Sequence, residues 1–298
     1  MRPVFGVHIM GTLIVLLSTG MWGISGVCGQ YLFEHTQIDS TWLIAVRQIL
    51  AGLMYMMVIV QRGKEPLFAI FRAQRQTLWK MLFFTLGLLG SQYGFYYAIK
   101  LSNAPTATVL IYTAPVFVVL QQVLMQHRPV EKKEAVGIFT ALMGVFLVST
   151  HGNPTSLVIS PAALFWSILS AIAMTLYTVA PAHILKEYSS PYLMGWGQLL
   201  SGFILLPLCN PFHSGVESWT FFSIGAMGYI IVFGTVVPFL MYFNGLKVIG
   251  PVKASLISCS EPLCSVLFSV AFLGTFLALP DYLGVVCIVG TVVMLSLK

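Results

Sequence analysis

The stretch FYYAIKLSNAPTATVLIYTAP at residues 95–115 is echoed by YFNGLKVIGPVKASLISCSEP at residues 242–262, at a constant offset of 147 residues. In this register identical residues coincide: Lys100 with Lys247, Ala107 with Ala254, and Pro115 with Pro262. Duplicated helical units embedded in lipid are a common construction of transporters, with the substrate site between the repeats. The echo therefore predicts two related halves, residues 1–150 and residues 151–298.

The composition indicates an integral membrane protein. Apolar residues make up 58% of the 298 positions and charged residues only 8%, against about 25% charged residues in soluble domains. The formal net charge of +6 sits in short loops, and no stretch combines a folded basic face with interleaved aromatics, so a nucleic-acid partner is not expected. The expected partners are the lipid bilayer and a small-molecule substrate.

Ten apolar segments nearly fill the chain, and each can form a helix long enough to span a hydrocarbon core. They predict an all-α protein with ten transmembrane helices, at residues 8–33, 41–60, 79–99, 104–125, 134–150, 161–184, 191–209, 219–244, 251–273 and 281–297. The connection at residues 61–78 is the longest, and its basic and aromatic residues fit either a surface amphipathic helix or a solvated loop.

The lysines and arginines of the short loops predict the orientation. Twelve of them fall on the side of the N-terminus, whereas Lys100 alone falls on the other side. Both termini are therefore expected in the cytoplasm. Each repeat has five helices, which is an odd number, so the second repeat starts on the opposite side of the membrane from the first. The two repeats are therefore expected to be inverted relative to each other.

Two charges lie within predicted spans, where a charge is costly and usually faces a cavity or a partner. Arg47 lies seven residues into the second span, and Glu261 lies in the ninth span, directly before Pro262. Both residues could be structural, and they could pair with each other. Alternatively, Glu261 takes up a coupling proton or binds a substrate cation.

The prolines Pro115 and Pro262 occupy equivalent places in spans four and nine. Each removes one helical hydrogen bond and frees a carbonyl, so we expect a hinge-like bend on either side of the pathway.

Small residues recur every third position in span one, at Gly20, Gly23, Gly26 and Gly29. Such a stripe permits close helix packing, which is the favoured interpretation. Trp22 lies beside this stripe and is a candidate to face a central cavity.

Further polar residues fall in the middle of predicted spans, where they need partners. They are Gln92, Thr108, Tyr112, Tyr177, Gln198 and Ser258. Some will bond only to adjacent helices. Together with aromatic faces, they describe a pocket suited to a small amphipathic metabolite.

Enzymatic motifs such as HExxH, GxSxG and a Gly-rich loop ending in Lys-Ser or Lys-Thr do not occur in the sequence. The five cysteines have no metal-ligand spacing. We expect no enzymatic activity, no cofactor and no metal site.

The sequence resembles the drug/metabolite transporter superfamily in its ten-helix EamA-type branch, over essentially the whole chain. The resemblance is carried by WGISGV, AVRQILAGLMY, YYAIKLSNAPTATVLIYTAPVFVVL and GLKVIGPVKASLISCSEPLCSVLF. It implies inverted five-helix repeats around a cavity lined by spans one to four and six to nine, with spans five and ten outside.

The chain departs from the family where Gly-Glu pairs often follow spans four and nine. Here His127 lies near the first Glu position, and the second pair reads Gly274-Thr275. Span one carries no acid before Glu34, so the proton exchange of small multidrug exporters does not carry over. Glu261 is the best candidate for coupling through a membrane carboxylate.

The sequence thus predicts a carrier of a small organic metabolite in the cell membrane, working by alternating access as a monomer or homodimer. Amino acids or related compounds are the favoured substrates, with export as the favoured direction. Import or export of cationic amines or drugs is the alternative, and a lipid scramblase or membrane scaffold is remote.

Overall fold

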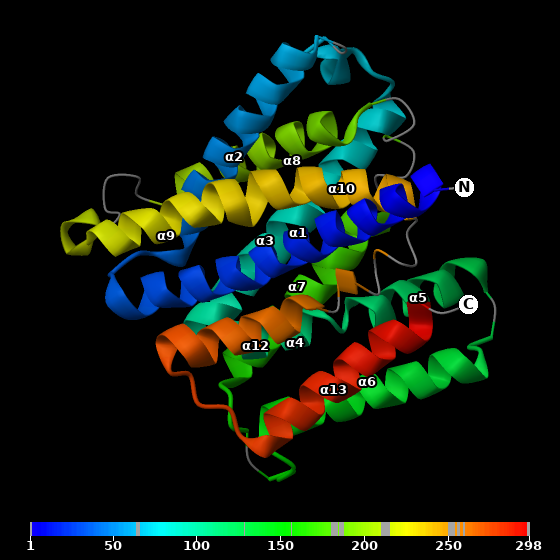
Figure 1. Ribbon diagram of the computed structural model, residues 1–298, viewed down its shortest axis with the longest axis vertical. Coiled ribbons are helices and arrows are strands. Elements are labelled where there is room, and N and C mark those ends of the chain that lie inside the picture. The colour runs from blue at the N-terminus through cyan, green and yellow to red at the C-terminus, as the bar shows by residue number, and fades with distance from the viewer. Residues whose placement is uncertain are drawn as a thin grey trace.

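The computed structural model describes the chain except residues 1, 64–65, 128, 156, 180–183, 185–187, 210–214, 250–253, 255–256, 259 and 297–298. Across the described residues the regular structure is helical, and no strand occurs among them. Figure 1 shows a bundle of long helices that lie alongside one another. This agrees with the predicted all-α class.

The helices of the first half follow the predicted spans closely. They are α1 (Arg2–His35), α2 (Ser40–Arg62), the 3₁₀ turn η1 (Ala69–Arg72), α3 (Arg75–Leu101), α4 (Ala104–Ile111), α5 (Ala114–Gln126) and α6 (Lys132–Thr150).

The second half contains a similar series with additional short elements. These are α7 (Pro161–Val179), α8 (Ser190–Leu205), η4 (Leu206–Leu208), η5 (Val216–Ser218), α9 (Phe221–Ile231), the π-helical η6 (Val232–Val236), α10 (Val237–Ile249), α12 (Ser260–Leu273) and α13 (Leu279–Ser296).

Among the described residues, five helical segments are long and apolar enough to cross a membrane: His8–His35, Ser40–Arg62, Ala104–Gln121, Lys132–Thr150 and Phe221–Ile249. Large apolar side chains also face outward, such as Phe221, which is 86% exposed. An outer surface of this kind suits lipid and would be costly in water. In Figure 1, α1 begins and α13 ends on the same side of the molecule. The cytoplasmic location of that side and the inverted arrangement stay predictions.

Glycines let helices from the two halves approach closely. A Cβ on Gly52 of α2 would lie 2.8 Å from the backbone nitrogen of Leu199 in α8. Likewise, a Cβ on Gly94 of α3 would lie 2.8 Å from the carbonyl oxygen of Trp166 in α7. Helices α6 and α13 pack on each other and lie at the edge of the bundle away from α2 and α8 (Figure 1).

Two predicted spans are interrupted. The span expected at residues 104–125 breaks after Ile111, because Tyr112 and Thr113 leave the helix before α5 begins at Ala114. The span expected at residues 219–244 contains the π-helical turn η6. Pro115 therefore lies in the first turn of α5, where its missing N–H costs no helical hydrogen bond, and not in the middle of a bent helix.

Pro262, at the corresponding sequence position, lies in α12. Part of the span expected at residues 251–273 lies outside the described residues. Whether either proline acts as a hinge stays a prediction.

The connection between α2 and α3 docks on the start of α8. The backbone N–H of Ile70 donates to the hydroxyl of Tyr192, which itself donates to the carbonyl of Leu67, both at 2.9 Å. The Trp196 indole donates to the same carbonyl at 2.9 Å. Ile70 is buried whereas Phe68 is 62% exposed, so this connection has one buried and one exposed face rather than being a plain solvated loop.

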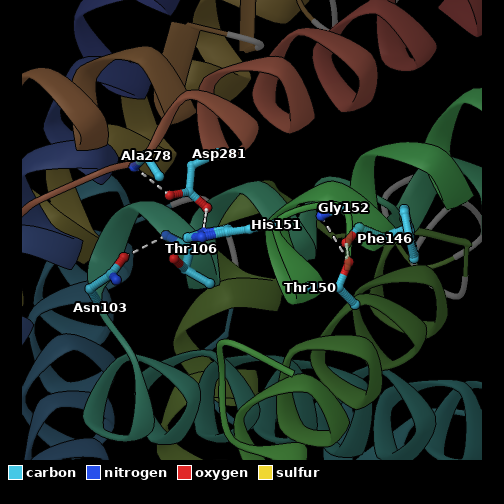
Figure 2. Close-up of polar contacts among 8 residues, drawn as sticks. All are labelled: Asn103, Thr106, Phe146, Thr150, His151, Gly152, Ala278 and Asp281. Atoms are coloured by element: carbon cyan, nitrogen blue, oxygen red, sulfur yellow. Dashed lines mark hydrogen bonds and ion pairs between the residues drawn. The ribbon is translucent and has the colours of Figure 1, made fainter. Parts of the chain in front are cut away.

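Helices α6 and α13 are joined at one end by a polar contact, drawn in Figure 2. Nε2 of His151 lies 3.0 Å from Oδ1 of Asp281. The other carboxylate oxygen of Asp281 accepts the backbone N–H of Ala278 at 2.8 Å, which caps the start of α13. The contact therefore holds the end of α6 against the beginning of α13.

Candidate functional site

A break between two helices brings Tyr112 close to Glu261. Glu261 lies in α12, and Tyr112 lies at the break between α4 and α5. The Tyr112 hydroxyl lies 2.6 Å from the carbonyl oxygen of Ser258 and 3.0 Å from Oε2 of Glu261, and it can donate to either oxygen. Three predicted site residues thus meet, each from the middle of a predicted span.

Aromatic rings from α1 and α10 gather close to this contact. The Trp22 ring lies 4.8 Å from the ring of Phe239 and 5.4 Å from that of Tyr242. Tyr242 in turn hydrogen-bonds with the side chain of Ser258 and lies in electrostatic range of Glu261. Tyr177 of α7 is in electrostatic range of Glu261 as well. These rings give the carboxylate a largely aromatic setting.

Helix α1 approaches the backbone of Glu261 directly. A Cβ on Gly23 would lie 2.9 Å from the Glu261 carbonyl oxygen and 2.8 Å from Cβ of Cys264. On the same stripe, a Cβ on Gly29 would lie 2.6 Å from the Tyr96 ring of α3. The prediction that these glycines serve close packing is therefore confirmed for both positions.

Arg47 forms a second polar centre. It is 3% exposed, its Nε donates to the Thr235 hydroxyl at 2.7 Å, and its Nη1 donates to Oε1 of Gln92 at 2.8 Å. Its guanidinium carbon lies 4.8 Å from the centre of the Tyr96 ring. The structure thus brings Gln92 together with Arg47, as two of the predicted site residues.

Arg47 and Glu261 do not form the ion pair that the sequence left open. Among the described residues, the ion pairs join Lys100 to Asp39 and His151 to Asp281.

The π-helical turn η6 supplies a partner for Arg47 that the sequence analysis missed. Thr235 lies in this turn and is fully buried, and the hydroxyl of Tyr55 lies 3.2 Å from the carbonyl oxygens of both Thr235 and Val236. Turns of this kind recur at functional sites. The small and polar pair Gly234-Thr235 within an apolar run is a signal that could have identified the position.

Two predicted site residues make no contact with either centre. Thr108 bonds to the carbonyl of Ala104 at 2.7 Å and to the Ser265 hydroxyl at 3.3 Å, and so ties α4 to α12. Gln198 is 1% exposed, and neither its amide oxygen nor its nitrogen has a hydrogen-bond partner among the described residues. The sequence analysis missed Gln48 of α2, whose buried amide oxygen and nitrogen also have no hydrogen-bond partner among the described residues.

Gln30 is another missed polar residue, and it joins three helices. Its Oε1 accepts the backbone N–H of Ala104 at 2.8 Å, and its Nε2 donates to Glu34 at 2.8 Å and to Thr275 at 3.1 Å. The contact ties one end of α1 to the start of α4 and to the residues after α12. The sequence around Gln30 in the first predicted span did not indicate these partners.

The positions that depart from the family pattern share a conformation. His127 ends α5 with φ 50° and Gly274 follows α12 with φ 61°, both in the left-handed region. They are related by the same offset as the sequence echo. By this offset His127 corresponds to Gly274, and each residue follows the end of its helix in the same conformation.

The sequence profile of the EamA-like transporter family matches the chain twice, at residues 9–150 and 161–297. The uncharacterized inner membrane transporter YicL of Salmonella typhimurium is 38% identical over 292 residues, covering 96% of this chain and 95% of YicL. The riboflavin transporter ImpX of Fusobacterium nucleatum is 24% identical over 305 residues, covering 97% of this chain and 98% of ImpX.

A solved crystal structure has the same fold at 15% identity. It superposes with a TM-score of 0.61 over 95% of both chains. At this identity the likeness concerns the fold alone.

Proposed function

Because the chain belongs to the EamA-like transporter family, we propose that it is a secondary-type transporter that moves a small organic metabolite across a cell membrane by alternating access. An amino acid or a related compound is the proposed substrate, and export is the proposed direction. The name of the relative YicL supports the inner or plasma membrane as the location.

The contact between Tyr112 and Glu261 is the observation that carries this proposal. Tyr112 belongs to the first match of the family profile and Glu261 to the second, and their side chains lie 3.0 Å apart. In alternating access the two repeats move relative to each other around a fixed site. A polar contact across that boundary can be made and broken as they move.

The helix break at Tyr112 supports the same interpretation. Transporter sites are commonly formed by discontinuous helices, because the interrupted backbone has polar groups that are free to bind a substrate or ion. Here the break lies next to a carboxylate, which makes Glu261 the candidate for binding a substrate ammonium group or a coupling proton.

Cationic amines or drugs are the second candidate substrate class. The rings of Trp22, Phe239 and Tyr242 pack together near Glu261, and aromatic faces with a carboxylate bind organic cations well. The name of the relative ImpX adds riboflavin as a compound to include in any substrate panel.

A comparison of exported metabolites tests the proposal. Cells that overproduce the wild-type protein are compared with cells that overproduce Glu261→Gln at matched membrane abundance, and intracellular and extracellular pools are quantified by mass spectrometry. We expect a compound enriched outside only with the wild type. Identical pools in the two strains would contradict export through Glu261.

A further inference from the structure

The positive charge of Arg47 is buried among neutral groups. It lies in a segment that is apolar enough to span a membrane, and its contacts are the Thr235 hydroxyl, the Gln92 amide oxygen and the Tyr96 ring. In the part of the chain that the structure describes, no carboxylate lies within ion-pair distance of this side chain.

A buried cation of this kind is incomplete without an anion. Neutral hydrogen bonds offset only part of the cost of removing a guanidinium from water, and an ion at membrane depth usually has a partner of opposite charge. Glu261 does not supply it, because the ion pairs of the described residues do not join it to Arg47; its carboxylate lies beside the Tyr112 hydroxyl.

The contacts of Arg47 also fix the direction of its guanidinium. Nε and Nη1 are occupied by residues from α3 and η6, and Tyr96 covers one face of the group. Nη2 donates no hydrogen bond to any described residue. An arginine held in this way can present its remaining donor edge to an anion with little further loss of side-chain freedom.

We propose that Arg47 is the anion-binding subsite of the carrier and that its substrates carry a carboxylate group, which binds at the Nη2 edge. This inference rests on the proposed transport function. A carboxylate balances the single charge of Arg47 and can accept a charge-assisted hydrogen bond from Nη2. Glu261 forms no ion pair with Arg47 among the described residues, so its carboxylate stays available for an ammonium group of the same substrate.

Transport by the wild-type protein tests the need for a carboxylate. The full chain is reconstituted in liposomes, and counterflow is measured for L-tryptophan, L-leucine and L-lysine, each beside its decarboxylated amine (tryptamine, isoamylamine and cadaverine). We expect the transported amino acid to be preferred over its amine by at least about tenfold, because a site built for a polar group rejects an analogue that lacks it.

Substitution of Arg47 tests its role in that preference. In Arg47→Gln we expect the ratio of amino acid to amine transport to fall towards one. Lys100→Gln removes an equal charge from an exposed ion pair and should leave the ratio unchanged. If Arg47→Gln does not accumulate, Arg47→Lys replaces it, because lysine keeps the charge without the fork of donors, and the ratio should fall there too.

The outcomes separate this inference from the transport proposal. Counterflow of amino acids and amines at equal rates by the wild type would overturn the anion subsite alone. A preference that survives in Arg47→Gln would overturn it as well. Counterflow of none of these compounds by the wild type would overturn the carrier proposal for this substrate class, and the subsite with it.

Discussion

The hydroxyl of Tyr112 lies 3.0 Å from Oε2 of Glu261, although 149 residues separate the two along the chain. Tyr112 lies where α4 ends, and Glu261 lies in α12. The end of a helix leaves backbone groups without helical hydrogen bonds, so the Tyr112 side of this contact has more polar groups nearby than the interior of a continuous helix offers. It is the basis of the predictions on transport.

Tyr112→Phe is expected to slow transport without lowering membrane abundance. The substitution keeps the ring and removes the donor to Glu261, and loss of a partner to a buried charged group costs about 1–3 kcal/mol. We therefore expect transport efficiency to fall by roughly 5- to 150-fold. Initial rates per mole of protein measure the effect, with Tyr282→Phe, whose residue is 43% exposed on α13, as the control. Equal rates for both variants would contradict the role of the hydroxyl.

Pro115→Ala and Pro262→Ala are each expected to slow transport more than they lower protein abundance. Pro115 begins α5 directly after the break, where alanine permits the helix to extend backward and to straighten the break. Pro262 occupies the corresponding sequence position beside Glu261 in α12. Rates normalised to membrane protein measure this effect. Pro161→Ala, at the start of α7, provides the control. If the transport rate and the protein abundance fall by the same factor, the two prolines contribute to packing and not to the transport motion.

Gly23→Val is expected to destabilise the bundle by about 1–3 kcal/mol, as overpacking does. Its Cβ would lie 2.9 Å from the backbone oxygen of Glu261, so α1 and α12 have to move apart. Thermal unfolding of the purified protein in detergent measures the loss. Gly225→Val is the matched control, because a Cβ there meets nothing within 4 Å. A lower midpoint temperature for the control than for Gly23→Val would refute the packing account.

Asp281→Ala is expected to lower stability by about 1–2 kcal/mol and to leave the transport rate per protein unchanged. The change removes the contact with His151 and the cap on Ala278, and caps typically contribute about 1 kcal/mol. The midpoint temperature reports the loss, with the exposed Glu217→Ala as control. A specific loss of transport at full stability would instead place Asp281 in the transport mechanism.

The hydropathy of the chain was sufficient to predict most helices. The expected span at residues 134–150 corresponds to α6 (Lys132–Thr150), and that at residues 41–60 corresponds to α2 (Ser40–Arg62). A long apolar run can satisfy its backbone in lipid only by forming a helix or a closed barrel, so composition and length carry this information directly.

The breaks and the side-chain partners were harder to predict. The wide turn at Val232–Val236 lies in an apolar run whose hydropathy does not distinguish π from α geometry. The partners of Arg47 come from α3 and η6, and such contacts depend on how helices are packed rather than on local sequence. The charge itself identified Arg47 and Glu261 as candidates, because a charge in a membrane span requires an explanation.

Counterflow across a defined bilayer tests the central claim most directly. Liposomes containing the wild type or Glu261→Gln are loaded with the compound found in the metabolite comparison, and entry of its labelled form is followed at several pH values. A carrier that uses Glu261 predicts saturable counterflow with the wild type, and loss of either the pH dependence or the recognition of a cationic group in Glu261→Gln. Absence of saturable counterflow by the wild type would contradict transport, and identical kinetics of the two proteins at every pH would contradict the role of Glu261.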